Sequence, residues 1–376
     1  MRFLLDHLIP AGPVLVVGDD TVDGHPGPNV YGKARHRDPV RSSHTYTAWR
    51  YGHTWVVLAV LVQFPFATRP WALPVLIDLY RSEEDDQERN RPHRTPAQLM
   101  CRLLRVLLLR FPDRVFVFAG DAGYGTHEVA RFCHRHRDRL TRVSKLHPDA
   151  NLFDPPPPYA GKGRPRLKGD RRLKPRQAVA ATTGFTRLPV GWYGGGKRNV
   201  DTLEGTGHGY KAGQKLVPLR WVFVRDMSGT HRDEYVFTTD VSLSPTRVIG
   251  YDGGRWNIET TFQEARSALG LETTRGWCQK TTLRAGPCLL GLYSVVAILF
   301  HAPGVETNRC GGVARQGDGD VLRRPVCGAA VAVGRDHFAT GRGGHASRQT
   351  PRTRAGTPTH HAGTGRLNQE NRHQSS

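Results

Sequence analysis

Apolar runs alternate with short polar segments along the first part of the chain. Residues 13–18 (PVLVVG) are apolar and rich in Val, and they predict a buried strand that ends at Asp19 and Asp20. Residues 53–64 and 71–80 are rich in branched and aromatic side chains, which favour strands. The pattern therefore predicts three successive strands arranged as a meander.

The following segment alternates between helical and strand patterns. Thr95 with Pro96 is a helix start signal, and the sequence AQLMCRLLRVLLLRF after it carries apolar residues at helical spacing. The run RVFVFAG then predicts a strand that ends at Asp121, Thr126 opens a second helix, and LTRVSK predicts a further strand. The expected order is three strands, a helix, a strand, a helix and a strand.

Changes in composition divide the chain into four parts. Residues 1–145 predict the first part of an α/β core, and residues 146–243 combine an exposed basic loop with Gly-rich strand patterns that predict a small β-rich insertion. Residues 244–302 return to a helical pattern and complete the core. Residues 303–376 lose apolar periodicity, so we expect a disordered basic tail.

One apolar run raises the question of a membrane. The sequence from Pro287 to Ala302 falls short of the roughly 20 residues that a bilayer-spanning helix needs. We therefore expect a buried core helix at this position and no membrane partner. Near the N-terminus, Asp6 and the Pro and Gly residues at positions 10 to 13 interrupt any signal-peptide pattern.

The net charge of the chain indicates which class of molecule it binds. Lys and Arg together number 54 against 33 Asp and Glu, a net charge of +21, which favours binding to polyanions such as nucleic acid. The six cysteines include no C-x-x-C pair and no regular spacing, which argues against both a structural zinc site and a disulfide framework. A cytoplasmic, nucleoid-associated location is the natural expectation.

Charged side chains gather on one predicted helix. Arg255, Glu259 and Arg266 share one helix face at 100° per residue, and taken alone Arg255 and Glu259 would form an ordinary i,i+4 ion pair. Asp20 and Asp121, however, each end a predicted strand, and sites collect at strand ends in open α/β sheets. Three converging carboxylates would repel one another without a divalent cation, so these residues predict a Mg²⁺ site.

Three motifs together resemble those of a known family. They are GDDT, FAGDAGYG, and the pattern Y-x3-R-x3-E-x6-R within YDGGRWNIETTFQEARSALGLE. They are similar to the motifs of DDE transposases from bacterial insertion sequences, in the insertion-sequence-four-like group with a Tyr-Arg-Glu-Lys signature. The resemblance implies an RNase H-like core with a mixed central sheet and flanking helices, interrupted by the β-rich insertion.

The resemblance also implies which carboxylates carry the chemistry. Asp20 matches the first catalytic, metal-binding carboxylate because it directly precedes Thr21, and Asp121 and Glu259 match the second and third. Asp19 is a rival for the first place. The family signature thus implies that Mg²⁺, with Mn²⁺ as a substitute, is held by these three residues.

Basic residues are expected to contact DNA. Tyr251, Arg255 and Arg266 match the Tyr, Arg and Lys of the family signature, where the basic residues contact phosphates; Arg in place of Lys keeps the charge and adds a bidentate fork. Arg164 and Arg166 lie in a GRPR segment of the basic loop that is similar to the core of a minor-groove AT-hook, although a plain solvated loop explains it as well.

The function implied is a transposase that cleaves DNA and transfers strands by two-metal phosphoryl transfer, with double-stranded DNA and a homodimer as partners. Two alternatives remain, namely a truncated, inactive DNA-binding remnant and a metal-dependent nuclease of RNase H-like fold. Truncation is an expectation because only about a dozen residues precede the first predicted strand, and because helical sequence ends after Phe300.

Overall fold

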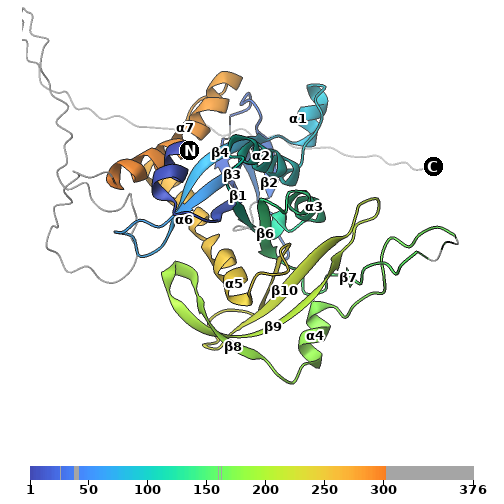
Figure 1. The fold of residues 1–376 in the computed structure, drawn as a ribbon. Helices are drawn as coiled ribbons and strands as arrows, with labels where there is room; N and C mark the ends of the chain where they lie inside the picture. The colour runs from blue at the N-terminus through green and yellow to red at the C-terminus, as the bar shows by residue number, and fades with distance from the viewer. Residues whose placement is uncertain (26, 38–41, 160, 162, 302–376) are drawn as a thin grey trace, which may run out of the picture. The chain divides into compact units, whose positions relative to one another are not determined.

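A computed structural model describes the chain apart from residues 26, 38–41, 160, 162 and 302–376 (Figure 1). Within this part, one mixed sheet has the strand order β2-β3-β1-β5-β6-β11-β10-β9-β7, with β4 paired to β3 and β8 paired to β9. The strands are β1 (Val14–Gly24), β2 (Ala34–Arg37), β3 (Trp49–Val62), β4 (Trp71–Tyr80), β5 (Phe116–Gly120), β6 (Leu140–Lys145), β7 (Leu152–Phe153), β8 (Thr186–Gly191), β9 (Lys197–Gly209), β10 (Val217–Asp226) and β11 (Glu234–Thr238).

Helices flank this sheet, which confirms the expected mixed α/β class. They are α1 (Glu83–Glu88), α2 (Pro96–Arg110), α3 (His127–Arg135), α4 (Pro175–Ala181), α5 (Pro245–Gly254), α6 (Asn257–Ala268) and α7 (Gln279–His301), with short helical turns η1 (Leu4–Leu8), η2 (Ala122–Tyr124) and η3 (Tyr193–Gly195). The start of α2 is the predicted one, because Thr95 and Gln98 form a reciprocal capping box.

The first half of the chain contains the predicted elements in the predicted order, with β2 and α1 added between them. Strands β1, β3 and β4 pair antiparallel as a meander, and β5 and β6 then add parallel to β1. This is the arrangement expected of an RNase H-like core. Strand β1 was predicted to end at Asp19 and Asp20, which is wrong: it continues to Gly24, because residues 19–24 remain paired to β3. The cross-strand ladder therefore keeps polar residues in the strand.

The β-rich segment extends the core sheet. The predicted strands LVPLRWVFVRD and EYVFTTD are present as β10 and β11, and β11 pairs antiparallel with β6 through Val236 and Lys145. Strands β9 and β10 form the long hairpin in the lower part of Figure 1. In the basic loop, Arg164 and Arg166 are exposed, as expected for a solvated segment. The predicted tail of residues 303–376 lies outside the described residues.

Alternation along the strands places two cores on opposite faces of the sheet. On one face, Val16 and Phe118 pack with Met100 and Leu104 of α2. On the other face, side chains of β1 and β3 such as Val17 pack with residues of α5 and α6. Because successive strand residues point to opposite faces, this division decides what each polar residue of β1 can contact.

Helix α7 is longer than the apolar run from which it was expected. It begins at Gln279, ahead of Pro287, and spans 23 residues, so it is long and apolar enough to cross a membrane by length and composition alone. Only 28% of its apolar window is buried, so the prediction of a buried core helix holds for one face. That face packs on the sheet edge, where the Ser294 hydroxyl donates to the carbonyl oxygen of Pro74 at 2.9 Å.

One glycine is required where β1 and β3 run closely together. A Cβ atom at Gly52 would overlap the backbone carbonyl oxygen of Asp23, which cannot move without breaking the ladder. Gly52→Ala should therefore lower the free energy of unfolding by about 1–3 kcal/mol. Gly250→Ala is the matched control, since a Cβ there meets open space on helix α5 and should stabilise by about 0.5–1 kcal/mol. Urea denaturation measures both, and equal stabilities would contradict the steric argument.

Candidate active site

The two adjacent aspartates of β1 lie on opposite faces of the sheet. Asp20 pairs with Val56 on the α2 face, where its Oδ1 accepts a hydrogen bond from the Tyr124 hydroxyl at 3.3 Å. Asp19 pairs with Val57 on the α5 and α6 face, where its Oδ2 lies 3.3 Å from Nη1 of Arg255. The structure thus brings Asp19, and not Asp20, into contact with the residues around α6.

Asp121 follows β5 directly, at the same edge of the sheet. Strands β1 and β5 are parallel with Gly18 opposite Gly120, so Asp19 and Asp121 are the next residues along two neighbouring strands. Asp121 also begins the short turn η2, because its Oδ1 accepts a hydrogen bond from the backbone N–H of Tyr124 at 3.2 Å. The predicted strand end therefore holds Asp121 in a fixed turn beside β1.

Arg255 connects Asp19 on β1 with Glu259 on α6. Its Nη1 donates to Asp19 Oδ2 at 3.3 Å and to Glu259 Oε1 at 2.9 Å, although Asp19 and Arg255 are 236 positions apart in the chain. The i,i+4 ion pair expected between Arg255 and Glu259 is present, and it also reaches β1. Only 6% of Arg255 is exposed, whereas the Glu259 side chain is 41% exposed. Glu259 is thus the more accessible of the two.

The site is crowded with negative charge. Burial raises the pKa of the Asp19 carboxyl to about 8, the charge of Asp121 acts in the same direction, and Arg255 opposes both. Burial and Asp121 also raise the pKa of Asp20. Asp20 is an exposed residue, whereas Asp19 is half-buried, so water screens the charge of Asp20 more than that of Asp19. A divalent cation among these oxygens would relieve the repulsion, and carboxylate oxygens are the donors that Mg²⁺ or Mn²⁺ prefers.

The other signature residues occupy different surroundings. Tyr251 lies on α5, where its hydroxyl accepts a hydrogen bond from Arg247 at 2.7 Å. Arg266 lies on α6, donates to the Thr21 hydroxyl, and forms an ion pair with Glu272 at 2.9 Å. The single helix expected for Arg255, Glu259 and Arg266 is wrong at its start, because α5 ends at Gly254 and α6 begins only at Asn257. Tyr251 therefore does not share a helix with Glu259.

A buried ion pair that sequence reasoning missed holds α5 against the sheet. Lys145, the last residue of β6, lies 2.7 Å from Asp252 of α5 and 2.5 Å from Glu234 of β11. Burial would lower the pKa of Lys145, but Asp252 together with Tyr193 and Glu234 outweighs it and raises that pKa. The ion pair fixes the helix that leads into Arg255. Its one signal in the sequence is a Lys at a strand end, the position that Asp121 also occupies.

A histidine cluster was missed as well. Asp23, His25 and His53 meet on the same face as Asp19, at the far end of β1. The sequence separates His53 from His25 by 28 positions and from Asp23 by 30, so only the pairing of Asp23 with His53 across β1 and β3 reveals the group. The D-x-H spacing at positions 23 and 25 was the one available signal.

Three comparisons relate the chain to known proteins. A solved structure of the piggyBac transposase synaptic complex with hairpin DNA is similar with a TM-score of 0.41 and 13% identity, covering 77% of this chain and 48% of that one. The chain thus spans about half the length of that relative. No curated protein matches the chain.

A family model also matches the chain. The family model described as DDE superfamily endonuclease matches residues 1–199, more than half of the 376 residues. The matched segment contains Asp19, Asp20 and Asp121, whereas Glu259 lies beyond it. The chain therefore belongs to the DDE superfamily endonucleases.

Proposed function

We propose that this chain is a transposase that cleaves and joins DNA strands with the carboxylates of Asp19, Asp121 and Glu259. The observation that carries the proposal is the contact of Arg255 with both Asp19 and Glu259, next to a strand end that bears Asp121. Asp19 takes the place that the sequence motif suggested for Asp20, because Asp20 faces α2 and Tyr124 instead.

The three carboxylates suit hard divalent cations, and we propose Mg²⁺, with Mn²⁺ as a substitute. Two ions held there would activate water or a 3′-hydroxyl and stabilise the charge that develops on the scissile phosphate. Arg255 donates to both Asp19 and Glu259 through the same Nη1, so both carboxylates are positioned before any substrate arrives. Asp121 is positioned independently by its turn.

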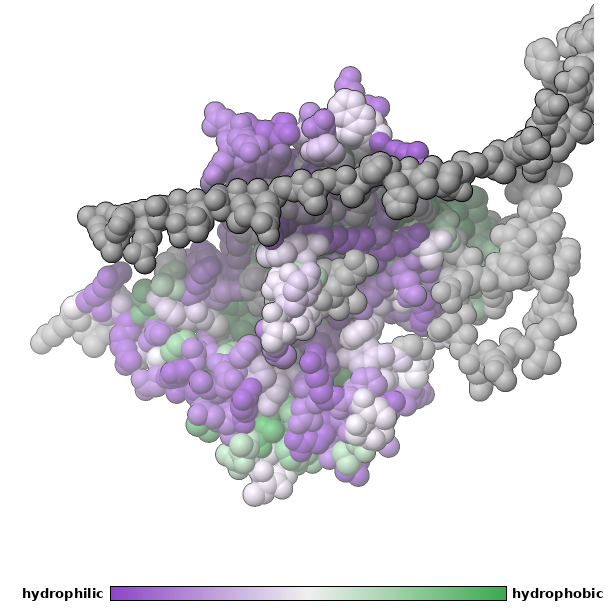
Figure 2. Space-filling model, turned by 180° about the vertical axis from the view of Figure 1, so that it is seen from behind, coloured by the Kyte–Doolittle hydropathy of each residue, from purple (hydrophilic) through white to green (hydrophobic). Residues whose placement is uncertain are grey.

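Double-stranded DNA is the partner that the charge favours. The chain carries a net charge of +21, and hydrophilic side chains dominate the face of the described residues shown in Figure 2. We also propose a homodimer, since two transposon ends must be handled together, and a cytoplasmic location. The four cysteines of the described residues are free thiols, which accords with a reducing compartment.

The test is a nicking and strand-transfer assay on the full chain. Supercoiled DNA, and DNA carrying the ends of its own element, would be incubated with Mg²⁺ or Mn²⁺ beside an Asp121→Asn variant. Metal-dependent nicking and joining that Asp121→Asn abolishes is the expected result. Nicking without joining would indicate a metal-dependent nuclease, and binding without nicking an inactive DNA-binding remnant; either result would overturn the transposase proposal.

Salt dependence tests the basic loop as part of the DNA interface. Each Lys or Arg that contacts a phosphate adds about 1 to the slope of log affinity against log salt, so Arg164→Gln/Arg166→Gln should lower that slope by about 2. The matched control is Arg187→Gln/Arg225→Gln, which removes two arginines outside the loop that pair with aspartates at 2.8 and 2.7 Å, as Arg166 does with Asp170 at 3.3 Å. Fluorescence anisotropy over a salt series measures the slopes, and equal losses in both double variants would remove the loop from the interface.

A further inference from the structure

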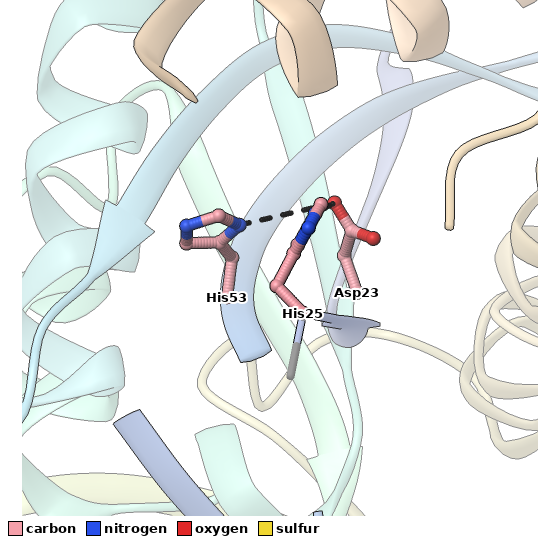
Figure 3. Close-up of side chains that lie close together, drawn as sticks. All are labelled: Asp23, His25 and His53. Carbon is pink, nitrogen blue, oxygen red and sulfur yellow. Dashed lines mark hydrogen bonds and ion pairs between the residues drawn. The ribbon is translucent and has the colours of Figure 1, made fainter. Parts of the chain in front are cut away.

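The side chains of Asp23, His25 and His53 form a buried cluster at the far end of β1 (Figure 3). His25 Nε2 lies 3.1 Å from Asp23 Oδ2, His53 Nδ1 lies 4.0 Å from the same oxygen, and the candidate ligand atoms all lie within 4.8 Å of one another. The three residues are between 1% and 6% exposed. An Asp and two His at this separation are a donor set that a transition-metal ion can occupy.

The hydrogen bonding of His53 turns one ring nitrogen toward the carboxylate. His53 Nε2 lies 2.9 Å from the backbone carbonyl oxygen of Tyr31, and since that oxygen can only accept, Nε2 must carry the proton. In the neutral ring Nδ1 then bears a lone pair, which lies near the negatively charged Asp23. A cation shared by the two groups removes this conflict. A metal-binding His whose other nitrogen donates to a backbone carbonyl is the usual arrangement at such sites.

The Asp23 carboxylate has unused capacity for a ligand. Its Oδ2 receives the contacts from His25 and from the Trp55 indole N–H at 3.5 Å, whereas its Oδ1 is buried and has no hydrogen-bond partner among the described residues. A buried charged oxygen without a partner is costly unless something binds it.

A cavity leads to the cluster from one side. It has a volume of about 470 Å³ and is lined by His25 together with residues of the segments 27–30 and 274–277. His25 Nε2 lies 3.3 Å from the Thr274 hydroxyl in its wall. The cavity gives an ion a route to His25 and leaves room for water as a further ligand. The cluster is therefore buried without being sealed.

We propose that Asp23, His25 and His53 bind Zn²⁺, with water from the cavity completing the coordination. Imidazole nitrogens with one carboxylate suit zinc, whereas Mg²⁺ prefers oxygen ligands alone, so this site selects a different metal from the three-carboxylate site. Asp23 lies four positions beyond Asp19 in the same strand, about 13 Å at the usual rise per residue. The two sites are separate, and the proposal does not depend on the transposase function.

The zinc site has a structural role in this proposal. It ties the end of β1 to β3 and to the loop that contains Tyr31, whose backbone N–H donates to the carbonyl oxygen of Trp277 at 2.9 Å. Trp277 belongs to the segment that connects α6 to α7. An ion at Asp23 therefore anchors the chain just beyond the helix that carries Glu259.

Zinc content and affinity test the site in the full chain, purified without a polyhistidine tag. Asp23→Asn keeps the side-chain shape without the charge, and His53→Gln can still donate to Tyr31. The control is His36→Gln, which changes a half-buried histidine of β2 outside the cluster. Wild type, His36→Gln and Asp19→Asn should each carry one zinc per chain by elemental analysis. Asp23→Asn and His53→Gln should bind Zn²⁺ at least 10- to 100-fold more weakly in competition with a chromogenic chelator.

Cobalt gives a second readout that does not depend on the variants folding. Co²⁺ added to the metal-free wild type should produce visible absorption typical of low-coordinate nitrogen and oxygen ligation, and one equivalent of Zn²⁺ should displace it. If the wild type neither carries zinc nor shows this absorption, the cluster is a hydrogen-bonded Asp and imidazolium group, and the proposal is wrong. Folded variants that retain zinc at wild-type affinity would also overturn it.

Discussion

Asp19→Asn should lower metal-dependent nicking by on the order of 100-fold or more, while Asp20→Asn should retain most of the activity. Loss of residues that merely support metal ligands costs about 10- to 100-fold, and loss of a ligand itself should cost no less. Asp19 lies beside Asp121 and bonds to Arg255, whereas Asp20 bonds to Tyr124 on the opposite face of the sheet. The measurement is the initial rate of supercoiled-plasmid nicking over a Mg²⁺ titration.

The two substitutions form a matched pair, because each replaces one carboxylate oxygen by an amide at neighbouring positions of the same strand. Thermal unfolding should show that both variants are folded before their rates are compared. Were Asp20→Asn inactive and Asp19→Asn active, the carboxylate on the α2 face would be the catalytic one. The contact of Arg255 with Asp19 would then be a purely structural ion pair.

Local patterns predicted the elements of the core well. Apolar runs located β1, β3, β4, β5 and β6, and the Thr95 start signal located α2, because hydrophobic periodicity and helix capping are properties of short segments. Asp121 was found at a strand end for the same reason. The mixed sheet with flanking helices follows from the order of these elements.

The sequence could not show which residues meet when they lie far apart in the chain. Neighbouring residues of a strand face opposite sides, so the preference between Asp19 and Asp20 required knowledge of which face α5 and α6 cover. The same limit applies to His53, which meets Asp23 only through the register of β1 and β3. The joining of β11 to β6 is likewise a long-range pairing, which composition does not encode.

Phe118→Ala should lower the free energy of unfolding by about 3–5 kcal/mol, a large part of the roughly 5–15 kcal/mol that holds a domain folded. Phe118 is fully buried at the centre of β5, where its ring lies over Gly18 of β1. The Arg142 guanidinium lies 4.9 Å from the ring centroid and donates to the carbonyl oxygen of Tyr124. The substitution therefore leaves a cavity and also weakens the support of the turn that holds Asp121.

Leu109→Ala is the control for this substitution, because it truncates an apolar side chain on α2 that is 74% exposed, and it should change stability by less than about 0.5 kcal/mol. Urea denaturation gives both free energies. Burial lowers the pKa of the Arg142 guanidinium to about 10 although nearby groups oppose it, and Phe118→Ala removes an aromatic ring that faces this cation. Nicking by Phe118→Ala should consequently fall at temperatures where the variant is still folded. A stable variant with full activity would show that the turn at Asp121 is held without Arg142.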